Sequence, residues 1–296
     1  MINPILEREL KTRMRTWKTI ILLCGYLTLI GLIVFFSFLS SSFSYSYGGY
    51  GFNPQIVTTI YIVIAMFQLG LLIAILPVFT ATSISGERER QTLDLLLCTN
   101  ISPWKIIFGK MSAALSFILL LILSAMPFMG IILLFGGVTL IDLFKIVLFY
   151  MATAVMVSAI GMFCTTHFKK NLTSIVMSYV ILGTTYFVPL FTMGVAAILL
   201  NAITMNSTRQ GLVTFVEKYS YEILLFFFSS NPFYGISSLL KIDNAGGLFY
   251  LLGSGGISTS NTLFRFITPW MGCTIYFIVA TVILLFLTKR RLVKLK

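Results

Sequence analysis

Residues 85–97 read SGERERQTLDLLL, and five of the first ten positions of this stretch are charged. Long apolar runs, almost free of charge, lie on both sides of it. A charged helix cannot lie in hydrocarbon, because each ionised side chain costs about 2.5–3.5 kcal/mol at the centre of a bilayer. We therefore expect this stretch to project into water at one face of a membrane, as an amphipathic helix with leucines along one side.

The composition is that of an integral membrane protein. Of 296 residues, 58% are hydrophobic and 10% are charged, whereas a soluble domain has roughly 25% charged residues. Six runs are long enough to cross about 30 Å of hydrocarbon as helices: 20–39, 56–82, 106–135, 144–165, 172–200 and 267–288. The sequence thus predicts an all-α membrane protein with six transmembrane helices, organised as a single transmembrane domain over residues 1–296.

The positive charge of the chain follows its topology. The formal net charge is +12, and most of the 21 Lys and Arg residues precede the first apolar run, follow the second or fourth, or close the chain. The positive-inside rule places these segments in the cytoplasm. We therefore expect a multi-pass protein of the cell (plasma or cytoplasmic) membrane with both termini cytoplasmic. Membrane lipids account for the basic residues, and no nucleic acid partner is expected.

Residues 1–19 show two helical stripes. Apolar residues recur on one face, at Leu6, Leu10, Met14 and Trp17, and basic residues recur on another, at Arg8, Lys11, Arg15 and Lys18. This pattern predicts an interfacial helix, with Trp17 and the apolar face in the acyl boundary and the basic face against lipid headgroups. The alternative is a basic flank that only sets the orientation of the first span.

The long segment 201–266 is expected on the outer side of the membrane. Within it, Tyr221–Phe228 is strongly apolar and ends at a Ser-Ser-Asn-Pro sequence. Eight residues are too few to span the bilayer. We predict a re-entrant segment that enters the membrane edge and returns before the last span.

Catalytic and metal sites are not indicated. His167 is the only histidine, so multi-histidine metal sites and histidine triads are unavailable. The four cysteines share no close spacing, and no carboxylate falls near the middle of a predicted span. The chain also lacks the G-x-x-x-x-G-K-[ST] loop that holds nucleotide phosphates. We expect no catalytic residue, metal or cofactor in this chain.

Three stretches together resemble type-2 ATP-binding-cassette (ABC) exporter permeases. The first reads ERExxTLDLLLxTxISPW over residues 87–104 and continues as IIxGK over residues 106–110. The others are NPILxREL at residues 3–10 and NPFY at residues 231–234. Two positions differ from the common pattern, since Gln91 stands where such permeases often have glycine and Asn100 where proline is common.

The resemblance implies a dimer, made with a second permease copy that is identical or related, and working with separate cytoplasmic ATPase subunits. ATP and Mg would be bound in those partner subunits. Residues 84–98 would form the coupling helix, which seats in a groove of the ATPase, and residues 1–19 the connecting helix. The implied ATPase-interface residues are Glu87, Arg88, Glu89, Arg90, Thr92, Leu93 and Leu96, with Leu93 and Leu96 anchoring the helix against the permease itself.

The expected function is ATP-driven export of a hydrophobic or amphipathic substrate (a lipid, a peptide or a drug-like molecule) from the cytoplasm or inner leaflet. The lack of charge at membrane depth and the many aromatic and Met side chains favour such a substrate. Candidate cavity residues are Tyr61, Phe67, Gln68, Tyr179 and Phe187, for each of which core packing is the alternative. The rival functions are a membrane sensor or scaffold that docks a non-ATPase partner, a passive channel and a membrane enzyme.

Overall fold

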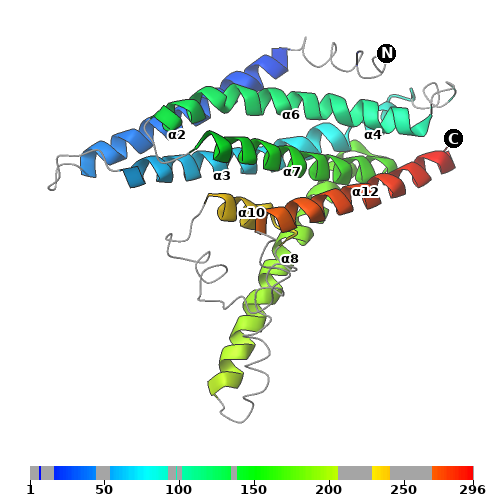
Figure 1. The fold of residues 1–296 in the computed structure, drawn as a ribbon. Helices are drawn as coiled ribbons and strands as arrows, with labels where there is room; N and C mark the ends of the chain where they lie inside the picture. Colours follow the sequence, from blue (N-terminus) through cyan, green and yellow to red (C-terminus); the bar gives the residue numbers. More distant parts are fainter. Residues whose placement is uncertain are drawn as a thin grey trace. The chain divides into compact units, whose positions relative to one another are not determined.

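The computed structural model describes residue 7 and residues 17–44, 54–92, 98, 102–134, 139–205, 229–240 and 269–295 (Figure 1). Within these ranges every regular element is a helix and no strand is present. The helices are α2 (Trp17–Ser44), α3 (Pro54–Ala81), α4 (Ser85–Glu89), α6 (Pro103–Leu134), α7 (Leu140–His167), α8 (Asn171–Met205), α10 (Pro232–Leu239) and α12 (Pro269–Leu295).

Six of these helices are long and apolar enough to cross a membrane, which confirms the predicted all-α fold with six spans. They are α2, α3, α6, α7, α8 and α12. Of the other predicted elements, the re-entrant run Tyr221–Phe228 lies outside the described residues. So does the interfacial helix at 1–19, apart from residue 7 and the start of α2.

The chain divides into two compact units. The first comprises residues 1–178 and 281–296, and the second comprises residues 179–280. Two helices, α8 and α12, contribute to both. The single transmembrane domain expected from the sequence stays a prediction.

In the first unit α7 is the central helix. It packs most extensively against α3 and also against α6, while α2 contacts α3 and α6 (Figure 1). Within the apolar window of α7, 67% of the residues are buried, against 11% for α2. The apolar side chains on the outside of α2 and α6 are therefore available to lipid, as expected for a bundle that has no water around it.

The starts of two helices follow from their capping residues. Pro103 begins α6, three residues before the predicted run 106–135, and the Ser102 carbonyl accepts hydrogen bonds from the backbone N–H groups of Lys105 and Ile106. The α7 helix begins four residues before the predicted apolar run. Its N-cap is Thr139, which forms a reciprocal capping box with Asp142. That box satisfies two backbone donors and extends the helix beyond its apolar part.

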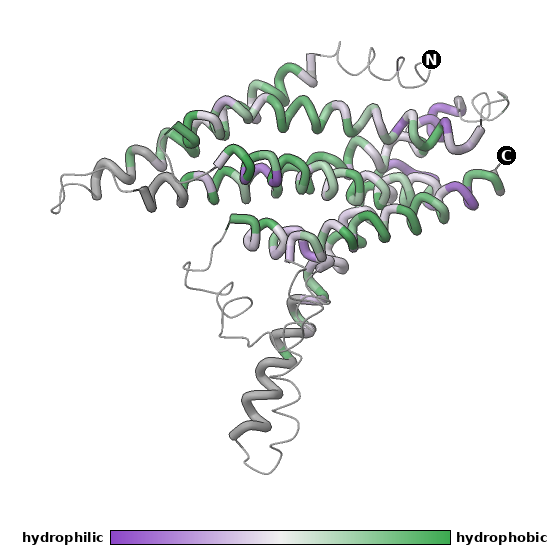
Figure 2. Tube along the Cα trace, viewed as in Figure 1, coloured by the Kyte–Doolittle hydropathy of each residue, from purple (hydrophilic) through white to green (hydrophobic). Residues whose placement is uncertain are grey.

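Polar residues gather at one end of the first unit. Figure 2 shows hydrophilic residues around α4 and the start of α6, whereas most of α2, α3, α6 and α7 is hydrophobic. A cluster of buried apolar residues supports this end: Ile84, Ile106, Ile107, Met111, Ala159, Met162, Leu285 and Leu292. The last part of α12 is held there as well, since the Lys289 ammonium lies 5.2 Å from the centroid of the Trp104 ring.

In the second unit, buried polar residues join α8 to the start of α10. The Asn231 side chain caps α10 by accepting a hydrogen bond from Phe233 N at 3.0 Å, and its Nδ2 donates to Tyr186 O at 3.3 Å. Ser230 Oγ donates to Thr185 O at 3.1 Å. The Asn-Pro pair at 231–232 thus begins α10 as an N-cap followed by proline at the first helical position.

Candidate functional site

The site is built around α4, in a segment that we call the α4 loop (residues 82–92). A turn over residues 82–84 separates α4 from the end of α3, and α4 ends at Glu89. Gln91 then has a φ of 57°, which a right-handed helix does not allow. A helix continuous over the predicted range 84–98 is therefore interrupted at this left-handed residue, and the assignment of a coupling helix stays a prediction. Residues 93–97 lie outside the described residues.

A buried ion pair fastens the α4 loop to α6. Lys110 Nζ lies 2.8 Å from Glu87 Oε1 and donates a hydrogen bond to Ser83 O at 2.7 Å. The Lys110 side chain is 1% exposed and the Glu87 side chain 15%. An ammonium group at such a position requires a partner, because an unpaired buried charge is strongly unfavourable.

Further hydrogen bonds fasten the same loop to α7 and α8. The backbone N–H groups of Ile84 and Ser85 donate to Thr165 Oγ1 at 3.1 and 2.8 Å. Ser85 Oγ donates to Asn171 Oδ1 at 2.6 Å. Asn171, the first residue of α8, donates from its backbone N to Glu89 Oε1 at 2.7 Å and from Nδ2 to Glu89 Oε2. The Glu89 carboxylate thus accepts a hydrogen bond from a backbone N–H group in the first turn of α8. Such an N–H group has no acceptor within its own helix.

Arg88 completes these connections. Its Nη1 donates to Phe168 O, in the connection between α7 and α8, at 3.2 Å. The α4 loop is therefore bound to α6, to the end of α7 and to the start of α8. A displacement of this loop cannot occur without breaking these bonds or moving the helices that they join.

Four consecutive side chains of the α4 loop are exposed: Glu89, Arg90, Gln91 and Thr92. We call them the exposed edge. Thr92 is itself held by a hydrogen bond from its N–H to Glu87 O at 2.9 Å. Lys110 of α6 and Thr165 of α7 hold residues 83–87 in place. The exposed edge is therefore a polar surface whose position relative to α6 and α7 is fixed.

The expected ATPase-interface residues fall into three groups. Glu87 and Arg88 are partly buried and bonded within the chain. Glu89, Arg90 and Thr92 belong to the exposed edge. Leu93 and Leu96 lie outside the described residues.

Sequence reasoning did not single out Lys110, Thr165 or Asn171. The available signal for Lys110 was a charge two turns inside an otherwise apolar run. Thr165 and Asn171 gave no comparable signal, since their partners lie about 80 residues away in the chain.

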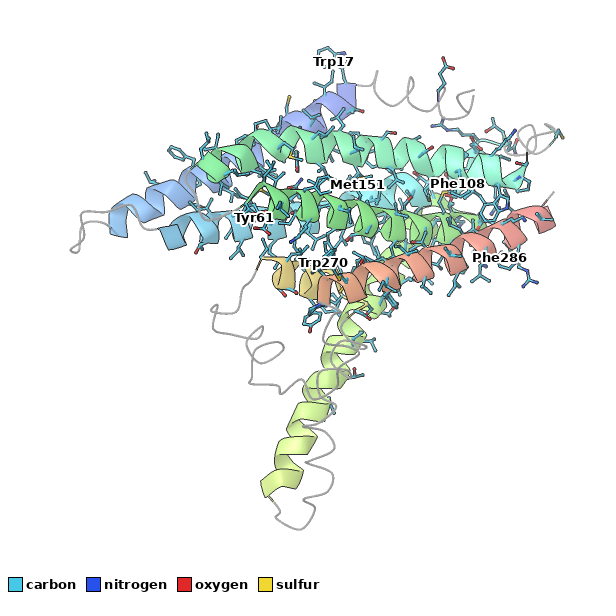
Figure 3. All side chains as sticks on the ribbon, viewed as in Figure 1. Trp17, Tyr61, Phe108, Met151, Trp270 and Phe286 are labelled. Carbon is cyan, nitrogen blue, oxygen red and sulfur yellow. The ribbon has the colours of Figure 1, made fainter. Side chains whose placement is uncertain are left out.

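The residues expected on the interfacial helix are mostly not described. Arg8, Lys11 and Arg15 lie outside the described residues, as does the side chain of Lys18. Trp17 begins α2, is 77% exposed and points away from the helices of its unit (Figure 3). Exposure of a large indole at the end of a membrane span is typical of an interfacial anchor.

The candidate cavity residues do not share one site. Tyr61 (Figure 3) and Gln68 are both buried and line a cavity of about 10 Å³ between α3, α6 and α7. That volume holds about one water molecule. Phe67 is half-buried and does not line this cavity, and Tyr179 and Phe187 are exposed residues of the second unit. This cavity is therefore too small for a lipid, a peptide or a drug-like molecule.

The two tyrosines beside this cavity differ in their hydrogen bonding. Tyr150 OH donates to Ala65 O at 2.8 Å and so links α7 to α3. The buried Tyr61 hydroxyl has no partner among the described residues. These residues also include no group of three or more His, Cys, Asp or Glu side chains placed to hold a metal.

Six apolar helices define a membrane protein that crosses the bilayer several times. The polar α4 loop, which is bonded to three of these helices, carries the exposed edge. A model of the ABC-2 family transporter proteins matches residues 3–292, nearly the whole chain, and the chain belongs to this family. It is the membrane component of an ABC transporter, which confirms the resemblance seen in the sequence, and membership implies association with ABC ATPase subunits. No curated protein gives a significant match to the chain.

Proposed function

We propose that this chain is the permease of an ATP-driven exporter and that the exposed edge is the surface through which the partner ATPase acts on it. The observation that carries this proposal is the attachment of the α4 loop, which joins a solvent-exposed polar edge to α6, α7 and α8 through buried or partly buried bonds. A surface held in this way passes a displacement on to the spans.

The proposal also revises the contact residues. Glu87 is bonded inward to Lys110, so it supports the α4 loop and does not reach a partner. Arg90 and Thr92 are exposed and lie beside the turn at Gln91, so they are the residues that meet the ATPase. Glu89 has both roles. It is exposed and so meets the ATPase, and its carboxylate supports the α4 loop by holding the start of α8.

The substrate is hydrophobic or amphipathic. In the described spans, charged residues lie within about three turns of a helix end, and none occupies the middle of a span. A highly charged solute would find no compensating group at that depth. The cavity beside Tyr61 is too small to serve as the substrate pathway, and we place that pathway between two permease copies.

The proposal is tested with charge changes on the exposed edge. We expect the double variant Arg90→Glu, Thr92→Glu to fold normally, because both side chains are exposed, and to lose most of the ATPase that co-purifies with the permease. Arg291→Glu is the matched control, since Arg291 is equally exposed at the end of α12. Retention of the ATPase and of substrate-stimulated ATP hydrolysis by the double variant would remove the exposed edge from the interface.

The same purification distinguishes an exporter permease from the rival function, a membrane sensor or scaffold. A cytoplasmic protein without an ATP-binding cassette, recovered in stoichiometric amount in place of an ATPase, would favour a sensor or scaffold. The substrate class is tested in reconstituted vesicles, where ATP-dependent movement of a fluorescent phospholipid, and none of a multiply charged dye, is expected. Transport of the dye would contradict the polarity argument.

A further inference from the structure

Lys110 has an unusual setting. It lies two turns inside α6, is 2% exposed, and its neighbours Ile106, Ile107 and Met111 belong to the buried apolar cluster beneath the α4 loop. The ammonium reaches both a carboxylate and a backbone carbonyl, Glu87 Oε1 at 2.8 Å and Ser83 O at 2.7 Å. One side chain of α6 therefore contacts the turn after α3 and the middle of α4.

Stability alone does not account for this pair. Replacement of a buried ion pair by apolar residues of similar volume is often neutral or stabilising, whereas removal of one partner is strongly destabilising. A hydrogen-bonded ion pair is directional, whereas an apolar contact is not. The pair forms only within a narrow range of distances and angles. Buried ionic groups can in this way specify one arrangement among several of similar energy.

We propose that Lys110 is a positioning residue, which holds the α4 loop in a single register against α6 so that a displacement of the exposed edge moves α3 and α6 together. This inference rests on the proposed function and names the residue that makes the α4 loop rigid. The Thr165 and Asn171 contacts are neutral or exposed hydrogen bonds to α7 and α8. The contact of Lys110 with Glu87 is instead ionic and buried. It therefore fixes the position and orientation of the α4 loop relative to α6 more strongly than those bonds do.

The test compares single and double variants. Lys110→Met and Glu87→Gln each leave the remaining partner without its counter-charge, so each is expected to lower the thermal stability of the purified permease. The double variant Lys110→Met, Glu87→Gln removes both charges of the pair, and its stability should return close to that of the original protein. Its coupling should not return. At equal recovery of the ATPase, we expect the ratio of substrate-stimulated to basal hydrolysis to fall about fivefold or more.

The result that overturns the proposal is a double variant that is as stable and as well coupled as the original protein, because the pair would then serve folding alone. A distance measurement covers the case in which the double variant does not fold. Spin labels at Arg90→Cys and Phe108→Cys, both exposed positions in the first unit, report the placement of the exposed edge relative to α6. Cys24 and Cys98 are replaced by serine, since both are exposed.

The milder Glu87→Gln variant is expected to broaden the distribution of distances between these two labels, and an unchanged distribution would contradict a positioning role. This measurement needs only the permease. If no ATPase is recovered with the original protein, the proposed function fails, while the distance measurement still decides whether Lys110 positions the α4 loop.

Discussion

Gln91 is the residue at which the local backbone departs most from what the sequence pattern predicts. Its φ of 57° lies in the left-handed region, where an L-residue with a Cβ atom is less stable by about 1–2 kcal/mol. Its side chain is exposed, so no buried contact compensates for this cost. The glycine that similar permeases often have at this position avoids the cost, because glycine has no Cβ atom.

The first prediction concerns this strain. Gln91→Gly should raise the free energy of unfolding by about 0.5–1 kcal/mol, since relief of the left-handed conformation exceeds the extra entropy of glycine in the unfolded chain. Gln91→Ala is the matched control and should bring no gain, because alanine keeps the Cβ atom. Thermal unfolding of the purified proteins in one detergent measures both. Equal stabilisation by alanine would show that the backbone conformation is not the cause.

At the scale of elements, the contact between α3 and α7 depends on the absence of one side chain. A Cβ atom at Gly161 would overlap Thr80 Oγ1, and it would lie 2.7 Å from Thr80 Cβ and 3.2 Å from the backbone N of Ala81. The last two atoms belong to or adjoin the backbone of α3 and cannot rotate away. Close approach at a small residue is a common way for membrane helices to pack, since they lack a hydrophobic driving force between them.

The second prediction follows from this packing. Gly161→Ala should lower the free energy of unfolding by about 1–3 kcal/mol, because the two helices must move apart or shift along each other. Gly70→Ala on α3 is the control, since a Cβ atom at Gly70 meets nothing within 4 Å. Thermal unfolding again gives the comparison. A Gly161→Ala protein as stable as Gly70→Ala would mean that α3 and α7 are not packed as described.

The elements were predictable to the extent that they depend on nearby residues. Apolar length gave the six spans, and proline at position 103 is a local signal for the start of α6, because helix starts depend on nearby residues. The α4 loop was not predictable in detail. Its leucine spacing and charges indicate one helix through residue 97, yet the backbone breaks at Gln91, and the bonds to Lys110, Thr165 and Asn171 join segments that are distant in the sequence. Sequence alone therefore indicated the location of the site, and the structure was needed for the direction of each side chain.

At the scale of the whole molecule, the six candidate spans among the described residues predict that residues 17 and 295 lie on the same side of the membrane. The distribution of Lys and Arg predicts that this side is the cytoplasm. The same assignment places the connection between α3 and α6, and Cys98 within it, in the cytoplasm. Cys98 is exposed, whereas Cys164 and Cys273 are buried.

The third prediction uses these native cysteines. A membrane-impermeant maleimide should label the protein in inside-out vesicles and not in intact cells, because the predicted orientation places Cys98 in the cytoplasm. Cys24 is exposed on the apolar helix α2 and should react poorly, since hydrocarbon disfavours the thiolate. Cys98→Ser should abolish the labelling. Labelling of intact cells that this substitution removes would reverse the predicted orientation.

On the proposal that the pathway forms between two permease copies, the residues of one chain are a poor guide to it. Polarity and aromatic character suggested five cavity residues, yet two of them line a space for about one water molecule and two are exposed in the second unit. A side chain on the surface of one copy faces either lipid or another copy. Both environments favour apolar residues, so composition does not separate them.

The two kinds of charge in the α4 loop respond differently to dissolved ions. Salt at physiological strength screens exposed charges beyond about 8 Å, and it screens buried pairs much less. On the proposed arrangement, concentrated salt weakens contacts made through Glu89 and Arg90, while Lys110 and Glu87 stay paired beneath them. A wash with concentrated salt would therefore release the ATPase and leave the α4 loop, to which the ATPase binds, in its folded arrangement. Dilution back to low ionic strength should then restore the complex without any refolding of the permease.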